Sequence, residues 1–348
     1  MNVVPDLVAA RFERQLLGAE QAGDVAAVAE RLLAVQAQDL RSARLAVRAR
    51  TRATSVADFD RALSTDRSLV IGWLNRGTLH LVRAEDYWWL HELTTPPLFT
   101  GNARRLAQTG VTGRAAEKGV ATLERALSTE GPLTRDALRD RLAAARVPTA
   151  GQALVHVLML ACLRGVAVRG PVVAGRHAYA LARDWLPSKR PAARDRALVE
   201  LARRYLAAHA PADDRDLAKW AGLPLRDARA GLRGIDSRLV HRADGLLELA
   251  GDERRGVPRP CLLDQWDPVL VGWRSRDPLL VDYPRFDDAA AHFRPFAYVA
   301  GRAVATWGLR NGHVELDPLF ARVSRSAAQQ LRRDADDVER FLSNVAPG

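Results

Sequence analysis

The segment Ser237-Arg238-Leu239-Val240-His241, followed across Asp244-Gly245 by Leu246-Leu247-Glu248-Leu249, has the form of a β-hairpin. Short apolar runs on either side of an Asp-Gly turn are a strong sequence signal for such a hairpin. Three segments with helical spacing of apolar residues precede it, over 192–208, 213–220 and 225–232. Three helices followed by a two-stranded hairpin is the arrangement of a winged helix, a variant of the helix-turn-helix.

An upstream segment repeats this plan. Helical patterns over 115–127, 134–144 and 149–163 lead into Val166-Ala167-Val168, which a glycine-containing turn joins to Arg176-His177-Ala178-Tyr179-Ala180. Internal repetition is stronger evidence for the fold than either copy alone. The N-terminal part also ends in a hairpin, with strands over 69–74 and 78–82 about Asn75-Arg76-Gly77, and we interpret it as a third, less regular copy.

The C-terminal third has a different composition. The runs 261–273 and 295–307 are aromatic and β-branched, Asn311-Gly312 predicts a tight hairpin turn, and a helix is expected over 327–342. We expect Trp266, Trp273 and Trp307 in the core. The predicted fold class is α+β, mainly α, with tandem winged-helix domains and a small C-terminal β-rich subdomain. The predicted domains span 1–112, 113–188, 189–255 and 256–348.

The charge of the chain indicates an anionic polymer as partner. Its 52 basic and 41 acidic residues give a net charge of +11, which favours nucleic acid. GC-rich coding can also enrich Arg, so the argument depends on the net excess and on the clustering of Arg around 41–52. The sequence has neither a long apolar run nor a signal peptide, and its two cysteines, Cys162 and Cys261, lie far apart. We therefore expect a cytoplasmic, nucleoid-associated monomer that makes no contact with a membrane.

Two glutamines one residue apart, Gln36 and Gln38, precede a series of arginines. Residues at i and i+2 point to the same side of an extended chain but to different sides of a helix. If both amides act on the same substrate group, the backbone there must therefore be extended or turning, or must lie at a helix end. The alternative is that both are solvated helix residues. Because Arg41, Arg44 and Arg48 are spaced three and four residues apart, they would share one face of a helix. That face would contact either DNA phosphates or acidic residues of the protein itself.

Together these segments resemble the winged-helix family of AlkZ-type DNA glycosylases. The resemblance depends on Gln36-Ala37-Gln38, on 76–82, on the tandem winged helices and on Asp264-Gln265-Trp266-Asp267 with the following 273–276. It implies that the winged-helix domains have a C-shaped arrangement and that the two glutamines lie at the catalytic centre. The related AlkX branch has an acid at the second position, so Gln38 places the chain nearer the AlkZ branch. That branch is associated with unhooking interstrand crosslinks formed by natural-product alkylators, a form of antibiotic self-resistance.

The chemistry of an amide pair fits such an enzyme. A purine alkylated at N7 or N3 already carries positive charge, so the base can leave without protonation, and amide oxygens can orient the attacking water. We therefore expect a monofunctional DNA glycosylase with Gln36 and Gln38 as catalytic residues. Possible auxiliary residues are Asp39, more simply a helix cap or a partner of Arg41, and His80, more simply structural.

The expected partner is double-stranded DNA with alkylated purines, and neither a cofactor nor a metal is expected. The expected DNA-binding residues are Arg41, Arg44, Arg48, Arg50 and Arg302. Walker, HExxH and GxSxG motifs do not occur in the sequence. Two alternatives to the glycosylase are a winged-helix transcription regulator without catalytic activity and a damage sensor that binds without cutting.

Overall fold

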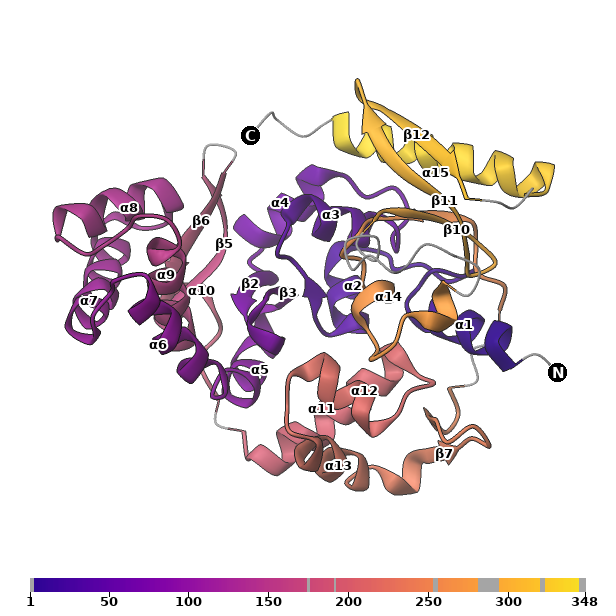
Figure 1. The fold of residues 1–348 in the computed structure, drawn as a ribbon, viewed down its shortest axis with the longest axis horizontal. Helices are drawn as coiled ribbons and strands as arrows, with labels where there is room; N and C mark the ends of the chain where they lie inside the picture. The colour runs from indigo at the N-terminus through magenta and orange to yellow at the C-terminus, as the bar shows by residue number, and fades with distance from the viewer. Residues whose placement is uncertain are drawn as a thin grey trace. The chain divides into compact units, whose positions relative to one another are not determined.

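The chain forms two compact units in the computed structural model, which describes residues 3–173, 176–190, 192–252, 256–280, 294–319 and 323–343 (Figure 1). The first unit comprises Met1–Phe59, Leu198–Trp220 and Pro224–Pro347. The second comprises Asp60–Ala197 and Ala221–Leu223. The predicted class, α+β and mainly α, is confirmed. The division into four domains and the C-shaped arrangement stay predictions.

The second unit combines helices with one antiparallel sheet. Two hairpins pair with each other through Ile71 and Arg169, so that its strands follow the order β3-β2-β5-β6-β4. The sequence assigned these hairpins to separate domains, and the structure joins them in one sheet. The elements are β2 (Leu69–Trp73), β3 (Leu79–Arg83), α5 (Tyr87–Thr94), α6 (Leu98–Gln108), α7 (Gly113–Glu130), β4 (Leu133–Thr134), α8 (Arg135–Ala144), α9 (Ala153–Leu163), β5 (Ala167–Val173), β6 (Arg176–Leu181) and α10 (Ala182–Trp185).

Local sequence accounts for the ends of these elements. The side chains of Thr112 and Thr134 accept from backbone amides in the first turns of α7 and α8, which satisfies donors that a helix leaves unpaired at its N-terminus. The β2–β3 turn contains Gly77 at φ +75°, a conformation that glycine adopts without steric strain. The hairpins and helices predicted for this region are thus confirmed within a few residues.

The first unit contains the N-terminal helices, the third predicted winged helix and the C-terminal sheet. Its elements are α1 (Val3–Arg14), α2 (Val25–Leu32), β1 (Val35–Gln36), α3 (Leu40–Arg48), α12 (Asp214–Ala221), α13 (Leu225–Arg233), β7 (Leu239–His241), β8 (Leu247–Leu249), β9 (Cys261–Leu263), α14 (Pro268–Val271), β10 (Phe296–Val299), β11 (Arg302–Arg310), β12 (His313–Pro318) and α15 (Arg325–Ser343). Three helices extend across the boundary between the units: α4 (Val56–Ser64), α11 (Arg194–His209) and, by its last residue, α12.

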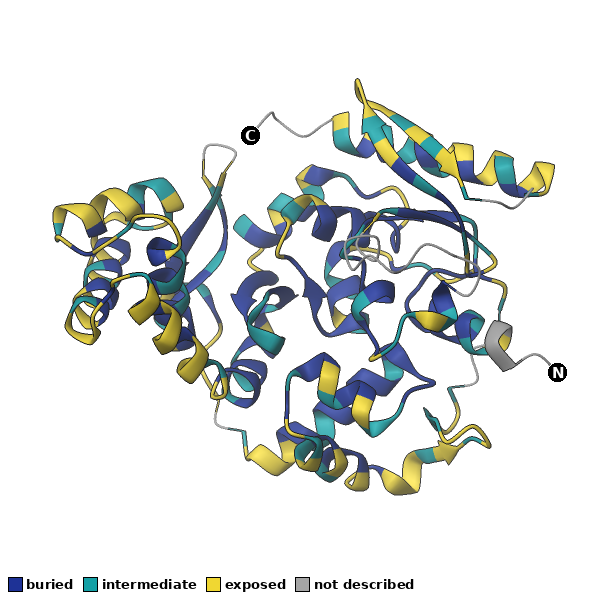
Figure 2. Ribbon diagram, in the orientation of Figure 1, coloured by how far each residue is buried: buried dark blue, intermediate teal, exposed yellow. Residues whose placement is uncertain are grey.

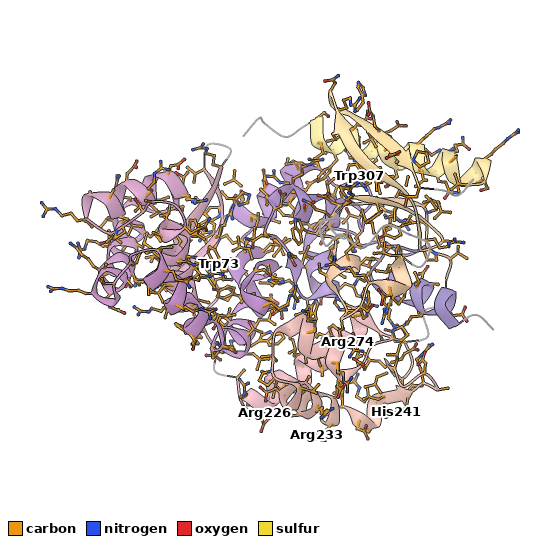
Figure 3. The ribbon with its side chains drawn as sticks, viewed as in Figure 1. Trp73, Arg226, Arg233, His241, Arg274 and Trp307 are labelled. Atoms are coloured by element: carbon orange, nitrogen blue, oxygen red, sulfur yellow. The ribbon has the colours of Figure 1, made fainter. Side chains whose placement is uncertain are left out.

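The C-terminal sheet has the order β12-β11-β10-β9 and is covered by α15 (Figure 1). Figure 2 shows that residues where the sheet approaches α3 are buried, while the outer faces of β12 and α15 are exposed. Trp307, labelled in Figure 3, is 5% exposed and donates through Nε1 to the carbonyl of Leu263 at 2.9 Å. The prediction that Trp273 and Trp307 belong to the core is confirmed, whereas Trp266 is half-buried.

The end of α11 forms an aromatic cluster with α12 and the segment after α14. His209 is fully buried and stacks on Tyr205, with ring centroids 4.6 Å apart, and Trp273 Nε1 donates to its carbonyl at 2.8 Å. Burial, together with the nearby cations Arg11, Arg50 and Arg31, lowers the pKa of His209 to about 3. The imidazole is therefore neutral in the folded protein near neutral pH. Among the described helices, none is long and apolar enough to cross a membrane.

Candidate active site

The two glutamines lie on a short connection between helices α2 and α3. Helix α2 ends at Leu32, where Leu33 adopts φ +64°, and the chain then runs extended through Val35 and Gln36 as strand β1. It bends at Gln38 before α3 begins at Leu40. The alternative of two solvated helix residues is therefore wrong. The backbone has the extended and turning form that two amides acting on one object require.

The two amides differ in exposure. Gln36 is buried, with 6% of the residue exposed, and the neighbouring Ala37 is 2% exposed. Gln38 is exposed to solvent. Both take part in interactions within the fold. The arrangement gives one amide held inside the protein and a second that a substrate can reach.

The residue after Gln38 caps helix α3. The Asp39 carboxylate accepts from the backbone N–H of Ser42 at 2.9 Å, and its backbone is extended at φ −107° and ψ 126°. This geometry is that of an N-cap, which satisfies one of the unpaired amides in the first helical turn. The simpler interpretation of Asp39, a helix cap, is confirmed. Gln38 thus directly precedes the N-terminus of α3, where the helix dipole places partial positive charge.

Ser42 also makes a buried contact with the C-terminal part of the chain. Its Oγ donates to Asp264 Oδ2 at 2.6 Å, and the two residues are 2% and 7% exposed. Asp264 follows strand β9 and belongs to the Asp264–Asp267 stretch that carried part of the family resemblance. Sequence reasoning did not connect it with the glutamines. The chain separation of 222 residues leaves no local signal for such a contact.

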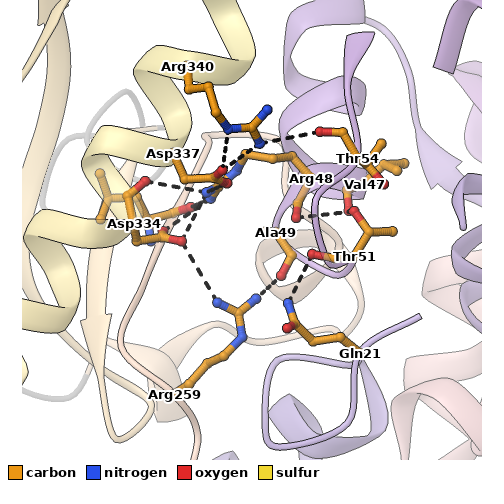
Figure 4. Close-up of polar contacts among 11 residues, drawn as sticks. Gln21, Val47, Arg48, Ala49, Thr51, Thr54, Arg259, Asp334, Asp337 and Arg340 are labelled. Atoms are coloured by element: carbon orange, nitrogen blue, oxygen red, sulfur yellow. Dashed lines mark hydrogen bonds and ion pairs between the residues drawn. The ribbon is translucent and has the colours of Figure 1, made fainter. Parts of the chain in front are cut away.

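The arginines of α3 divide into an exposed member and buried ones. Arg41 is exposed, and Arg44 is 8% exposed with its guanidinium carbon 5.7 Å from the centroid of the Phe59 ring. Arg48 donates to Asp334 at 2.9 Å and to Asp337 at 3.0 Å (Figure 4). Burial alone would lower the pKa of Arg48, but the two carboxylates outweigh burial and raise it above its ordinary value.

Arg50, just beyond α3, is fully buried. Its guanidinium forms a bidentate pair with Asp267 at 2.7 and 2.8 Å and donates to Gln15 Oε1 at 3.0 Å. The prediction that Arg48 and Arg50 contact phosphate is corrected, because both guanidinium groups are buried against acids of the protein. Arg302 is exposed at the first position of β11.

His80 belongs to the second unit, on strand β3, and is 1% exposed. Its Nδ1 lies 3.0 Å from the carbonyl of Thr78. Burial, together with nearby Arg76, lowers the pKa of His80 to about 3, so the ring is neutral over the working range of most enzymes. In the part of the chain that the structure describes, no group of His, Cys, Asp or Glu could hold a metal ion.

Comparison with known proteins assigns the fold to a class of DNA repair enzymes. The chain is similar to the solved structure of the Streptomyces sahachiroi DNA glycosylase AlkZ, with a TM-score of 0.78 and 23% sequence identity, over 98% of this chain and 97% of that one. A curated protein of the same organism, described as an interstrand DNA cross-link repair glycosylase, is 27% identical over 95% of this chain and 94% of its own length.

The family model described as DNA glycosylase AlkZ-like matches residues 29–341. The chain belongs to the AlkZ-like DNA glycosylase family, as the sequence resemblance implied, and is an enzyme that acts on DNA. The family decides against the alternative of a transcription regulator without catalytic activity.

Proposed function

We propose that this glycosylase hydrolyses the N-glycosidic bond of cationic alkylated purines, N7-alkylguanine above all, and that it acts as a monomer on double-stranded DNA. Interstrand crosslinks made by natural-product alkylators contain such bases. The description of the relative as an interstrand DNA cross-link repair glycosylase supports this substrate class. It also supports a role in self-resistance to an alkylating antibiotic.

The proposed catalytic groups are the amides of Gln36 and Gln38. The observation that carries this assignment is their position on an extended connection at the start of α3, one amide buried and the other exposed. We assign the orientation of the attacking water to the amide oxygens, which also place partial negative charge beside the sugar as positive charge develops there. An alkylated purine leaves as a neutral base, so the reaction does not require a general acid.

The two proposed auxiliary residues, Asp39 and His80, both have structural roles in the fold. Asp39 caps α3 with its carboxylate, and in this way it fixes the backbone beside Gln38. A neutral, buried imidazole at His80 is unsuited to proton transfer near neutral pH, which agrees with a mechanism that needs no titrating side chain. The proposed DNA contacts are the exposed Arg41 and Arg302, and Arg44 of the same helix as Arg41, although Arg44 is only 8% exposed.

A glycosylase assay tests the proposal directly. A duplex with one N7-alkylguanine is incubated with enzyme, treated with alkali and analysed for strand cleavage at the abasic site. We expect Gln36→Ala and Gln38→Ala each to slow excision by about tenfold or more, since an oriented polar group is worth on the order of 3 kcal/mol at the transition state. Duplex affinity should change little.

The matched control is Gln330→Ala, which removes an exposed glutamine from α15. It should excise at the rate of the unaltered protein. Full activity in the Gln36→Ala/Gln38→Ala double variant would refute the assignment of the catalytic groups. Efficient release of uracil, a neutral base, would contradict the proposed substrate class.

A further inference from the structure

The buried hydrogen bond between Ser42 and Asp264 connects the start of α3 to the C-terminal part of the chain. Ser42 lies in the first turn of the helix, and its Oγ donates to Asp264 Oδ2 at 2.6 Å. A hydroxyl that donates to a carboxylate forms a short, strong hydrogen bond, and burial of both residues shields it from water. This contact therefore fixes the first turn of α3 firmly.

The segment that contains Asp264 also contacts the other end of α3. The carbonyl of Leu262 accepts from Arg48 at 3.3 Å, and Asp267 binds Arg50 as a bidentate pair. Helix α3 is thus attached to one short segment, residues 262–267, at both ends. The C-terminal attachment is an ion pair and the N-terminal one is the Ser42–Asp264 bond. Loss of the N-terminal bond should loosen the first turn and leave the helix in place.

The first turn of α3 is in turn bound to the residue beside Gln38. The backbone N–H of Ser42 donates to the Asp39 carboxylate at 2.9 Å, and Ala43 N–H donates to the Asp39 carbonyl at 3.1 Å. A continuous series of short contacts therefore leads from Asp264 through Ser42 and Asp39 to the backbone of Gln38. Catalytic groups must be held within about 0.5 Å of their productive position, so such support affects rate.

We infer that Asp264 is a positioning residue for Gln38, and that it acts through Ser42. The inference depends on the proposed function of Gln36 and Gln38. Asp264 holds the first turn of α3, and that turn sets the direction in which the Gln38 amide faces the substrate. Its effect should appear in the chemical step and not in DNA binding, because Asp264 is buried and Arg41 supplies the exposed charge.

The test measures single-turnover excision and duplex affinity for Asp264→Ala, Asp264→Asn and Ser42→Ala. We expect Asp264→Ala and Ser42→Ala to slow excision by about tenfold, since misplacement by about 1 Å can reduce rate up to about 10²-fold. Asp264→Asn keeps an oxygen that can accept from Ser42 and should recover most of the rate. Duplex affinity should stay within about twofold throughout.

A double-mutant cycle identifies the route by which Asp264 acts. In a Gln38→Ala background, Asp264→Ala should cause no further loss, because the group it positions is already absent. The control is Ser55→Ala, which removes a similar serine–aspartate bond, to Asp58 at 2.7 Å, at the start of α4. That variant should excise normally.

The outcomes separate the inference from the proposed function. If Gln38→Ala retains full activity, the proposed function fails. If Gln38→Ala is slow but both Asp264→Ala and Ser42→Ala excise as fast as the unaltered protein, the positioning role is overturned. Losses that multiply in the double variant would likewise overturn it, because Asp264 would then act independently of Gln38. If Asp264→Ala does not fold, Ser42→Ala replaces it as the variant that removes the hydrogen bond, and Asp264→Asn remains the variant that keeps an acceptor.

Discussion

The fully buried ion pair between Arg50 and Asp267 leads to a quantitative prediction about stability. Both side chains are 0% exposed, and the guanidinium also donates to the carbonyl of Ala46 at 2.8 Å and to Gln15 Oε1 at 3.0 Å. Arg50→Ala removes all four of these hydrogen bonds and leaves the Asp267 carboxylate buried without its cation. Breaking one side of a buried pair typically costs about 3–5 kcal/mol of unfolding free energy.

The assay is chemical unfolding in urea, followed by tryptophan fluorescence. We expect Arg50→Ala to lower the unfolding free energy of the first unit by about 3–5 kcal/mol. The control is Arg310→Ala, which removes an exposed pair with Glu315 whose atoms lie 3.2 Å apart. Exposed pairs contribute about 0–1 kcal/mol, so this control should unfold close to the unaltered protein.

A second measurement distinguishes a structural arginine from a DNA-binding one. If Arg50 serves the fold, folded Arg50→Ala protein should bind duplex DNA with an unchanged dependence on salt concentration. A variant of normal stability whose salt dependence falls by about one unit would refute the reasoning, because that result is the signature of a lost phosphate contact.

Three further predictions concern DNA binding and pH. Arg41→Ala, at the exposed position of α3, should reduce the salt dependence of duplex binding by about one unit, whereas an unchanged dependence would exclude a phosphate contact. Excision rate should be nearly constant between about pH 6 and 9, because glutamine does not titrate and His80, with a pKa of about 3, stays neutral; a bell-shaped profile would contradict this. Stability should fall as pH drops from about 6.5 toward 3, by about 1.4 kcal/mol per pH unit for each such histidine, because the unfolded chain binds a proton that folded His209 does not. His209→Phe should reduce this slope in unfolding measurements between about pH 6 and 4, and an unaltered slope would refute the explanation.

The sequence by itself determined the elements and the family. Helices follow from apolar periodicity and capping residues, and hairpins follow from Asn-Gly and Asp-Gly turns, all of which depend on neighbours a few residues apart. The cap at Asp39 and the turn at Asn311-Gly312 belong to this group. The paired glutamines, a local motif, were recognised in the same way, and the family comparison confirmed the enzyme class.

Only the tertiary structure separated the arginines of the same short region. Spacing predicted that Arg41, Arg44 and Arg48 share a helix face, but it could not show what that face meets. In the fold Arg41 is exposed while Arg48 binds acids 286 and 289 residues away, and Arg50 binds one 217 residues away. Asp264 reached Ser42 over a comparable distance along the chain. Local periodicity determines the direction of a side chain, whereas its charge partner and its burial depend on which distant segment packs there.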